Sequence, residues 1–287
     1  KSVDDLEKEV EKQCAYFEKA TYQLFVQQWI HRNTPYRGLL IYHGLGTGKT
    51  CSAISIAETF LEHYRVPPGF KNAEPIVWVI ASPTLQESFE REIYNFQEPY
   101  QCTDDIYERL IPNFHKLAPA ARSNQIAKLV KSRYRMFSYL EFANYIDQNP
   151  DVNVDEKIII VDEAHNLRIN PMHLEDKKVS AALTSVLRRA VNTRLVLLSA
   201  TPMYDKPFEI LFLLSLLLVN DKREHVMSPD KLPSVDDPKA IVLLEKLAQE
   251  YISYVRGQNP FTFAPRLSPD VNGAEMLQKA SKRTVRN

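Results

Sequence analysis

A glycine-rich stretch that ends in Gly48, Lys49 and Thr50 is the strongest chemical signal in the sequence. It follows an apolar run and opens a stretch of helical periodicity, which is the context that a phosphate-binding loop requires. Glycines let backbone amides turn toward a phosphate, the Lys49 ammonium would neutralise β- and γ-phosphate oxygens, and the Thr50 hydroxyl would be a ligand of Mg²⁺. His43 replaces the first glycine of the general pattern, and a loop that merely turns the chain is the alternative interpretation. The residues predicted to hold a nucleotide such as ATP are Gly44, Leu45, Gly46, Thr47, Gly48, Lys49 and Thr50.

Two adjacent carboxylates, Asp162 and Glu163, follow a second apolar run. Carboxylates at the end of a buried strand are costly unless a cation holds them. Asp162 would hold Mg²⁺ through water, and Glu163 would polarise the attacking water as a general base. Alone, such a pair is typical of a solvated strand end, but a glycine loop about 110 residues upstream favours the catalytic interpretation. The predicted catalytic residues are Lys49, Asp162 and Glu163.

Hydroxyl groups follow a third apolar run, in the sequence Ser199, Ala200, Thr201 and Pro202. The hydroxyls of Ser199 and Thr201 can form hydrogen bonds with His165, which comes directly after the carboxylate pair and Ala164. Such contacts would connect the hydrolysis site to the movement of a neighbouring domain. Taken alone, these four residues are typical of a turn.

The apolar runs before these motifs predict the strands that position them. Runs at residues 39–42, 76–81, 158–161 and 195–199 are nearly continuous in Ile, Val and Leu. Such runs are typical of strands buried on both faces of a parallel sheet. Helical stretches lie between or after them, at residues 50–64, 85–96, 123–131 and 179–191. This alternation predicts an α/β fold with a doubly wound, mainly parallel sheet flanked by helices.

The regions on either side of this core are predicted to be largely helical. The sequence indicates helices at residues 3–31 and 210–219, a polar loop at 220–236, and a linker or an arm lying on the domain at 257–287. Asp237 and Pro238 are a suitable cap and first turn for another helix, which is predicted to continue to about residue 255.

Composition restricts the class of protein. The 287 residues are 44% hydrophobic, which is enough for a sizeable core, and 36 basic residues balance 36 acidic ones. A net charge of zero gives no basic signature of nucleic-acid binding, so any such contact must come from local geometry. The three cysteines show neither metal-ligand nor disulfide spacing, which predicts a reducing, intracellular location. Cys51 lies at a predicted helix N-terminus, where a lowered thiol pKa is the alternative to the preferred packing role. The longest apolar run is about half of the ~20 residues that a membrane span needs, so no membrane association is expected.

The three motifs, in this order, resemble motifs I, II and III of superfamily 2 helicases of the Asp-Glu-Ala-His type. The resemblance implies a RecA-like ATP-binding domain at residues 34–219, after an N-terminal helical segment at 1–33 and before a helical extension and linker at 220–287. Ser82, Pro83 and Thr84 resemble motif Ia, Ser138 and Tyr139 resemble motif Ib, and both motifs touch the nucleic-acid backbone in that family. Gln23, after Tyr22, resembles the glutamine motif that reads adenine. The alternatives are a buried strand end for residues 82–84, core packing for Tyr139 and an exposed helix face for Gln23.

Two longer stretches, residues 36–51 and 253–261, resemble helicase-like NTPases of large cytoplasmic DNA viruses. That group includes the poxvirus early transcription factor small subunit, nucleoside triphosphate phosphohydrolase I, and asfarvirus and giant-virus relatives. The resemblance implies nucleic acid as a partner and a role in a transcription complex. DNA is preferred to RNA, and both stay open at this point. It also implies the host cytoplasm as the location, with packaging in the virion as a further expectation.

The sequence departs from the family pattern after Ser199, because nothing there resembles motifs IV to VI or supplies an arginine finger. We therefore expect a second RecA-like domain in the full-length chain and poor turnover by residues 1–287 alone, since a finger contributes about 10³ to 10⁵ in rate. The leading interpretation is a motor that couples ATP hydrolysis to movement along nucleic acid. A transcription initiation subunit that grips DNA and hydrolyses ATP slowly is the alternative. A small-molecule kinase is disfavoured by the motifs around Asp162 and Ser199.

Overall fold

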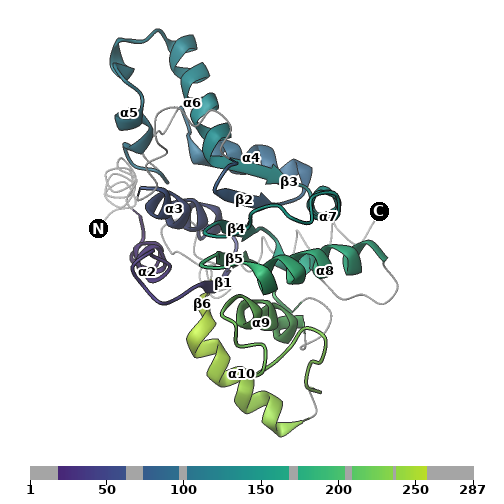
Figure 1. Ribbon diagram of the computed structural model, residues 1–287. Helices are drawn as coiled ribbons and strands as arrows, with labels where there is room; N and C mark the ends of the chain where they lie inside the picture. Colours follow the sequence, from purple (N-terminus) through teal and green to yellow (C-terminus); the bar gives the residue numbers. More distant parts are fainter. Residues whose placement is uncertain are drawn as a thin grey trace, which may run out of the picture.

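A parallel sheet runs through the centre of the structure, with the strand order β3-β2-β4-β5-β1-β6 (Figure 1). The computed structural model describes residues 19–62, 74–96, 102–167, 174–203, 209–234 and 237–256. The strands are β1 (Gly38–His43), β2 (Val77–Ile80), β3 (Tyr134–Phe137), β4 (Ile158–Val161), β5 (Arg194–Leu198) and β6 (Ile252–Val255). All five pairings between neighbouring strands are parallel, which confirms the predicted fold class.

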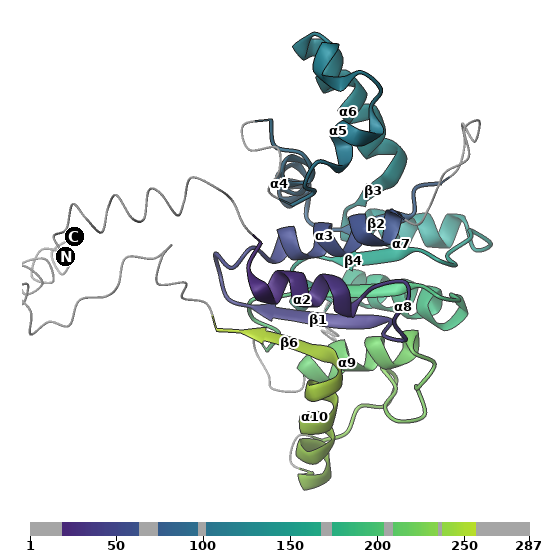
Figure 2. The same ribbon diagram turned by 90° about the vertical axis from the view of Figure 1, so that its left-hand side faces the viewer.

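Helices cover both faces of this sheet (Figure 2). The α-helices are α2 (Thr21–Trp29), α3 (Lys49–Leu61), α4 (Pro83–Ile93), α5 (Ile106–Leu110), α6 (Pro119–Arg133), α7 (Tyr139–Gln148), α8 (Leu174–Arg189), α9 (Glu209–Asn220) and α10 (Pro238–Tyr251), and two short 3₁₀ helices are η1 (Phe114–Lys116) and η2 (Ala164–Asn166). The predicted first helix near the N-terminus and the predicted linker at 257–287 lie outside the described residues.

Side-chain alternation along the central strands divides the core into two halves. Leu39 and Ile41 of β1 pack with α2, α3 and α4, whereas Leu40 between them packs with α8, α9 and α10. The same alternation holds in β2, β4 and β5, and all four strands are buried almost completely. Both faces of each strand are therefore apolar, which is the physical reason for the continuous Ile, Val and Leu runs in the sequence.

Two of the strands were not predicted. β3 is short and contains Arg135, and β6 was expected to be the end of the preceding helix, because Ile252 continues its helical spacing. That helix, α10, ends instead at Tyr251, and the next four residues pair with β1. Its start is as predicted, since the Asp237 side chain accepts a hydrogen bond from the amide of Lys239 and Pro238 lies in the first turn. A four-residue, largely apolar segment fits a helix or a strand, so the free edge of β1 decided its conformation.

A helical projection formed by α5, η1 and α6 extends from the side of the sheet that α3 covers (Figure 2). It is anchored to α3 through Glu58, which is 1% exposed and forms an ion pair with Arg133 of α6. The hydroxyls of Tyr107 and Tyr134 donate hydrogen bonds to Glu58 Oε1 over 3.0 and 2.7 Å. A buried carboxylate is tolerated when a countercharge and donors surround it in this way.

A disulfide between Cys51 of α3 and Cys102 adds a covalent anchor for the chain that leads into α5. Their Cα atoms are 5.0 Å apart although the residues are 51 positions apart in sequence. This corrects the expectation that no cysteine pair forms a disulfide and that Cys51 has only a packing role. The cysteine spacing gave no signal because the folding of α3 against the projection brings the two residues together. The cysteines therefore no longer support the prediction of a reducing location.

The most apolar helix of the structure, α9, is an internal element that packs between the sheet and α8 and α10. No helix among the described residues has both the length and the apolar character that crossing a bilayer requires.

Replacing both Cys51 and Cys102 with serine is expected to lower the free energy of unfolding by about 2–4 kcal/mol, because the disulfide closes a long loop in the unfolded chain. Urea denaturation of the two proteins in non-reducing buffer measures this difference. With dithiothreitol present, the parent should unfold at nearly the same urea concentration as the variant. Equal stability without reductant would contradict the disulfide.

Candidate nucleotide-binding site

The three predicted motifs meet at one edge of the sheet. The glycine loop follows β1, Ser199 follows β5, and Asp162 follows β4, and these three strands are neighbours in the order β4-β5-β1. The strand ladder continues into the motifs, because the amide of Ser199 donates to the carbonyl of Ile41 and that of Asp162 to the carbonyl of Ile80. The carboxyl ends of parallel strands form the edge where α/β proteins bind ligands.

The glycine loop has a compact conformation that is closed by its own hydrogen bonds. Gly46 and Gly48 have φ angles of 73° and 71°, a left-handed backbone that favours glycine. Thr47 Oγ1 donates to the Gly44 carbonyl over 2.7 Å, and Lys49 Nζ lies 3.4 Å from the same oxygen. Lys49 is therefore at the loop that it is predicted to serve. The side chain of Leu45 is 73% exposed, so any contribution of this residue would come from its backbone amide.

Helix α2 supports the loop from the outside. Gln23 is 5% exposed, its Nε2 donates to the Gly48 carbonyl over 3.2 Å, and its Oε1 accepts from the amide of Ala20. Tyr22 donates its hydroxyl to the Thr47 carbonyl over 2.8 Å, and burial raises the pKa of this hydroxyl. Gln23 does not lie on an exposed helix face. Its amide holds the loop backbone in this structure, and the reading of adenine stays a prediction.

The carboxylate pair differs in environment. Asp162 is 7% exposed, and burial, followed by the charge of Glu163, raises its pKa, while Lys49 and His165 act in the opposite direction. Glu163 has a φ angle of 49°, a left-handed conformation that is uncommon for a residue with a side chain. Its carboxylate contacts His165, with Oε2 3.2 Å from Nδ1.

A hydrogen-bonded chain joins the second and third motifs. His165 Nδ1 is 3.1 Å from Ser199 Oγ, which is the predicted contact between a hydroxyl and this histidine. Ser199 is fully buried and its Oγ also accepts from the amide of Thr201. Thr201 therefore takes part through its backbone rather than its hydroxyl. The coupling role of these three residues stays a prediction.

Two residues near the carboxylates were not predicted as parts of a nucleotide site. The hydroxyl of Tyr139 donates to the carbonyls of Asp162 and Glu163, and burial raises its pKa. Glu92 of α4 is half-buried, and burial and the charge of Asp162 raise its pKa. Neither residue belongs to a local motif of this site, so only the packing of α7 and α4 reveals them.

The residues predicted to touch nucleic acid lie after the neighbouring strands β2 and β3. Pro83 and Thr84 are exposed at the start of α4, where Ser82 Oγ lies 3.2 Å from Thr84 Oγ1. Ser138 is engaged within the protein, because it caps α7 and exchanges hydrogen bonds with Glu141. Thr84 is exposed, whereas Ser82, Ser138 and Tyr139 are half-buried. All of these contacts with nucleic acid stay predictions.

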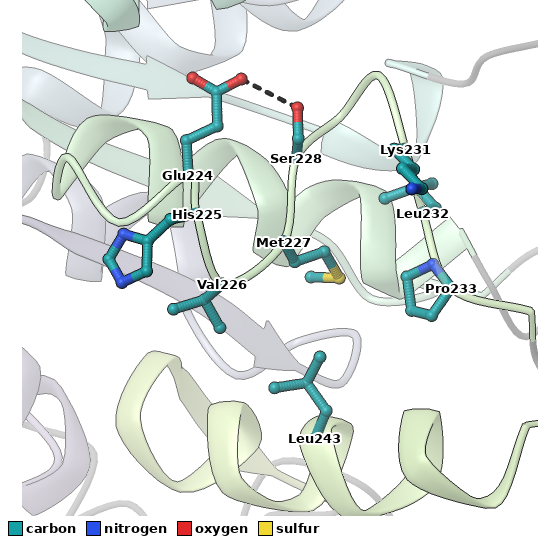
Figure 3. Close-up of a pocket in the computed structure, with 9 residues that line it drawn as sticks. All are labelled: Glu224, His225, Val226, Met227, Ser228, Lys231, Leu232, Pro233 and Leu243. Carbon is teal, nitrogen blue, oxygen red and sulfur yellow. Dashed lines mark hydrogen bonds between the residues drawn. The ribbon is translucent and has the colours of Figure 1, made fainter.

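A hollow of about 350 Å³ lies in another part of the protein (Figure 3). It is lined by Glu224, His225, Val226, Met227, Ser228, Lys231, Leu232, Pro233 and Leu243. The segment that forms it follows Asn220, whose side chain binds the carbonyls of Arg37 and Thr193 just before β1 and β5. The hollow thus contains no predicted site residue, and its lining segment starts at the opposite edge of the sheet.

Comparisons with known proteins agree with these motifs. The sequence model of the family described as "Type III restriction enzyme, res subunit" matches residues 8–204. A protein of Acanthamoeba polyphaga mimivirus that is named as an ATP-dependent RNA helicase is 31% identical over 88% of this chain and 44% of its own length. A termination factor NPH-I homolog of African swine fever virus is 28% identical over 61% of this chain and 21% of its own length.

The solved structure of the Sulfolobus solfataricus SWI2/SNF2 ATPase core in complex with double-stranded DNA is 15% identical, with a TM-score of 0.49, over 83% of this chain and 44% of that one.

The chain spans less than half the length of the mimivirus and African swine fever virus relatives. The family match covers more than half of the chain and includes all three motifs. This protein belongs to the superfamily 2 helicase family described by that sequence model, and it carries the helicase-type ATPase domain of the viral relatives.

Proposed function

We propose that this chain binds ATP with Mg²⁺ at the edge formed by β1, β5 and β4, and that it is the ATPase half of a motor that moves along nucleic acid. The observation that carries the proposal is that Lys49, which follows β1 and the glycine loop, lies at the same edge as Asp162 and Glu163, which follow β4. A binding protein without hydrolysis has no use for the Glu163 carboxylate, which contacts His165, a residue that Ser199 holds in turn.

The donor set around Asp162 fits Mg²⁺. Asp162 is nearly buried, and burial, followed by the charge of Glu163, raises its pKa, so a cation beside it would favour the ionised carboxylate. The described residues contain no group of three side chains that could hold a metal ion by themselves. Mg²⁺ needs no such group, because it commonly binds one or two protein oxygens and takes the rest from phosphates and water. Thr50 would bind the ion directly and Asp162 would hold it through water, and the ion would neutralise phosphate charge.

Each catalytic side chain has a distinct role in the proposed hydrolysis. Lys49 would leave the Gly44 carbonyl for the phosphate oxygens, which are stronger partners for an ammonium group than a neutral carbonyl. Glu163 would orient and deprotonate the attacking water. An arginine from a second RecA-like domain would complete the site, and the greater length of the relatives supports the presence of such a domain in the whole protein.

The proposed biological setting is transcription of a large DNA virus, on DNA rather than RNA. The African swine fever virus relative is named as a termination factor homolog, which supports the transcription setting. The mimivirus relative is named as an RNA helicase, so the choice of DNA rests on the sequence resemblance alone. ATPase measurements on the full-length protein with single-stranded DNA, duplex DNA and RNA test the choice of DNA over RNA and the choice of a motor over an initiation subunit. Stimulation by RNA alone would contradict the choice of DNA, and hydrolysis that no nucleic acid stimulates would favour the initiation-subunit alternative.

Lys49→Ala is expected to abolish measurable ATP binding, a loss of about 100-fold or more, because no other cation lies in the loop. Equilibrium binding of labelled ATP to the 287-residue chain measures this. Lys239→Ala on α10 is the matched control, since it removes an exposed lysine outside the site. Binding by Lys49→Ala at the parental affinity would show that the phosphate-loop assignment is wrong.

Glu163→Gln is expected to keep ATP binding and to reduce hydrolysis by about 10²- to 10⁴-fold, because the amide preserves the shape but cannot accept a proton. Steady-state turnover and ATP affinity of the full-length protein separate the two effects. Glu245→Gln, at an exposed position of α10, should change neither quantity. Unchanged turnover in Glu163→Gln would remove this residue from the catalytic role.

Gln23→Ala is expected to weaken the binding of ATP and GTP by a similar factor, about five- to tenfold, because the amide already supports the loop backbone. Competition binding with both nucleotides gives the two affinities. Gln28→Ala, an exposed position of the same helix, is the control. A loss for ATP without a loss for GTP would instead assign Gln23 to the reading of adenine.

A further inference from the structure

His43 occupies a buried position between the glycine loop and the edge strand β6. It is 0% exposed and ends β1, directly before Gly44. Its Nε2 lies 2.8 Å from Ser253 Oγ of β6, and the Tyr22 ring meets it edge to face with a centroid distance of 5.3 Å. The ring thus contacts β6 on one side and the helix that supports the loop on another. A glycine, which the general loop pattern has at this position, would reach neither.

The His43 ring is neutral at physiological pH. Burial, followed by the charge of Lys49, lowers its pKa to about 4. Nδ1 is buried without a hydrogen-bond partner in the described part of the chain. Because a buried N–H without an acceptor costs more than a bare lone pair, we assign the proton to Nε2, which donates it to Ser253.

The backbone adds a second link between the same two segments. The amide of Gly44, the first residue of the loop after His43, donates to the carbonyl of Val255 over 3.0 Å. β6 has one described neighbour in the sheet, β1, with which all four of its residues pair, and these residues are half-buried or exposed. The position of β6 therefore depends on the end of β1 and the start of the loop.

We propose that His43 is a positioning residue that couples the glycine loop to β6 through Ser253, so that nucleotide bound in the loop stabilises β6. The proposal rests on the proposed nucleotide site. Nucleotide phosphates would fix the backbone that begins at Gly44, and the neighbouring His43 ring would transmit this order to the edge strand. The coupling concerns the edge strand β6, rather than the reacting atoms.

Amide hydrogen exchange of the 287-residue chain, with and without Mg²⁺ and a non-hydrolysable ATP analogue, tests the coupling. In the parent, the analogue should slow exchange both in the loop, residues 44–50, and in residues 253–256, the latter by about tenfold. His43→Gly keeps the backbone link from Gly44 and should retain loop protection, while the effect on residues 253–256 falls to within about twofold.

Three further variants separate positioning from a general loss of structure. Ser253→Ala removes only the hydroxyl partner and should reproduce the His43→Gly result. His43→Gln places an amide Nε2 near the position of the imidazole Nε2 and should restore most of the coupling. Tyr254→Phe is the matched control, since it removes a hydroxyl from the adjacent residue, which is 59% exposed and contacts Tyr42 instead.

The outcomes distinguish this proposal from the proposed function. Loop protection in the parent without any effect at residues 253–256, or full coupling in Ser253→Ala and His43→Gly, would overturn the role of His43 and leave the nucleotide site intact. Absence of loop protection in the parent would overturn the nucleotide site, and the coupling with it. Loss of coupling in both variants, with recovery in His43→Gln, would establish the proposal.

Discussion

Parallel pairing of β4, β5 and β1 is the constraint on which the site depends, because it places three carboxyl-terminal strand ends side by side. The pairing is possible only because both faces of these strands are apolar and each is covered by helices. The buried backbone must be fully paired, and the ladder that satisfies it also sets the register of the motifs. Asp162 and Ser199 thereby reach the edge where the glycine loop begins.

Polar groups at this edge are held by contacts that extend well beyond the three motifs. Gln23 and Tyr22 of α2 bind carbonyls of the loop, and Tyr139 of α7 binds the carbonyls of the carboxylate pair. Helix α2 packs in one half of the core and Tyr139 packs against the other, and the two halves lie on opposite faces of the sheet. Side chains that hold backbone in this way fix the geometry of charged groups before a ligand arrives, which reduces the reorganisation needed for hydrolysis.

The helix after the loop, α3, has a second structural role. Its buried face binds the projection through the Glu58 cluster and the disulfide of Cys51, which directly follows the predicted magnesium ligand Thr50. The helix is thus fixed along its length against the projection as well as against the sheet. A rigid α3 keeps the amides at its N-terminus directed at the loop, where a phosphate would bind.

The sequence by itself determined the fold class and the identity of the three motifs, because strands buried on both faces need continuous apolar residues and phosphate chemistry needs glycines, a lysine and carboxylates at strand ends. Only the tertiary structure decided the pairing of β6, the disulfide and the contacts of His43. These join positions far apart in the chain, 210 residues for His43 and Ser253 and 51 for the two cysteines. Local spacing carries no information about such contacts, since they form only where separate elements pack against each other.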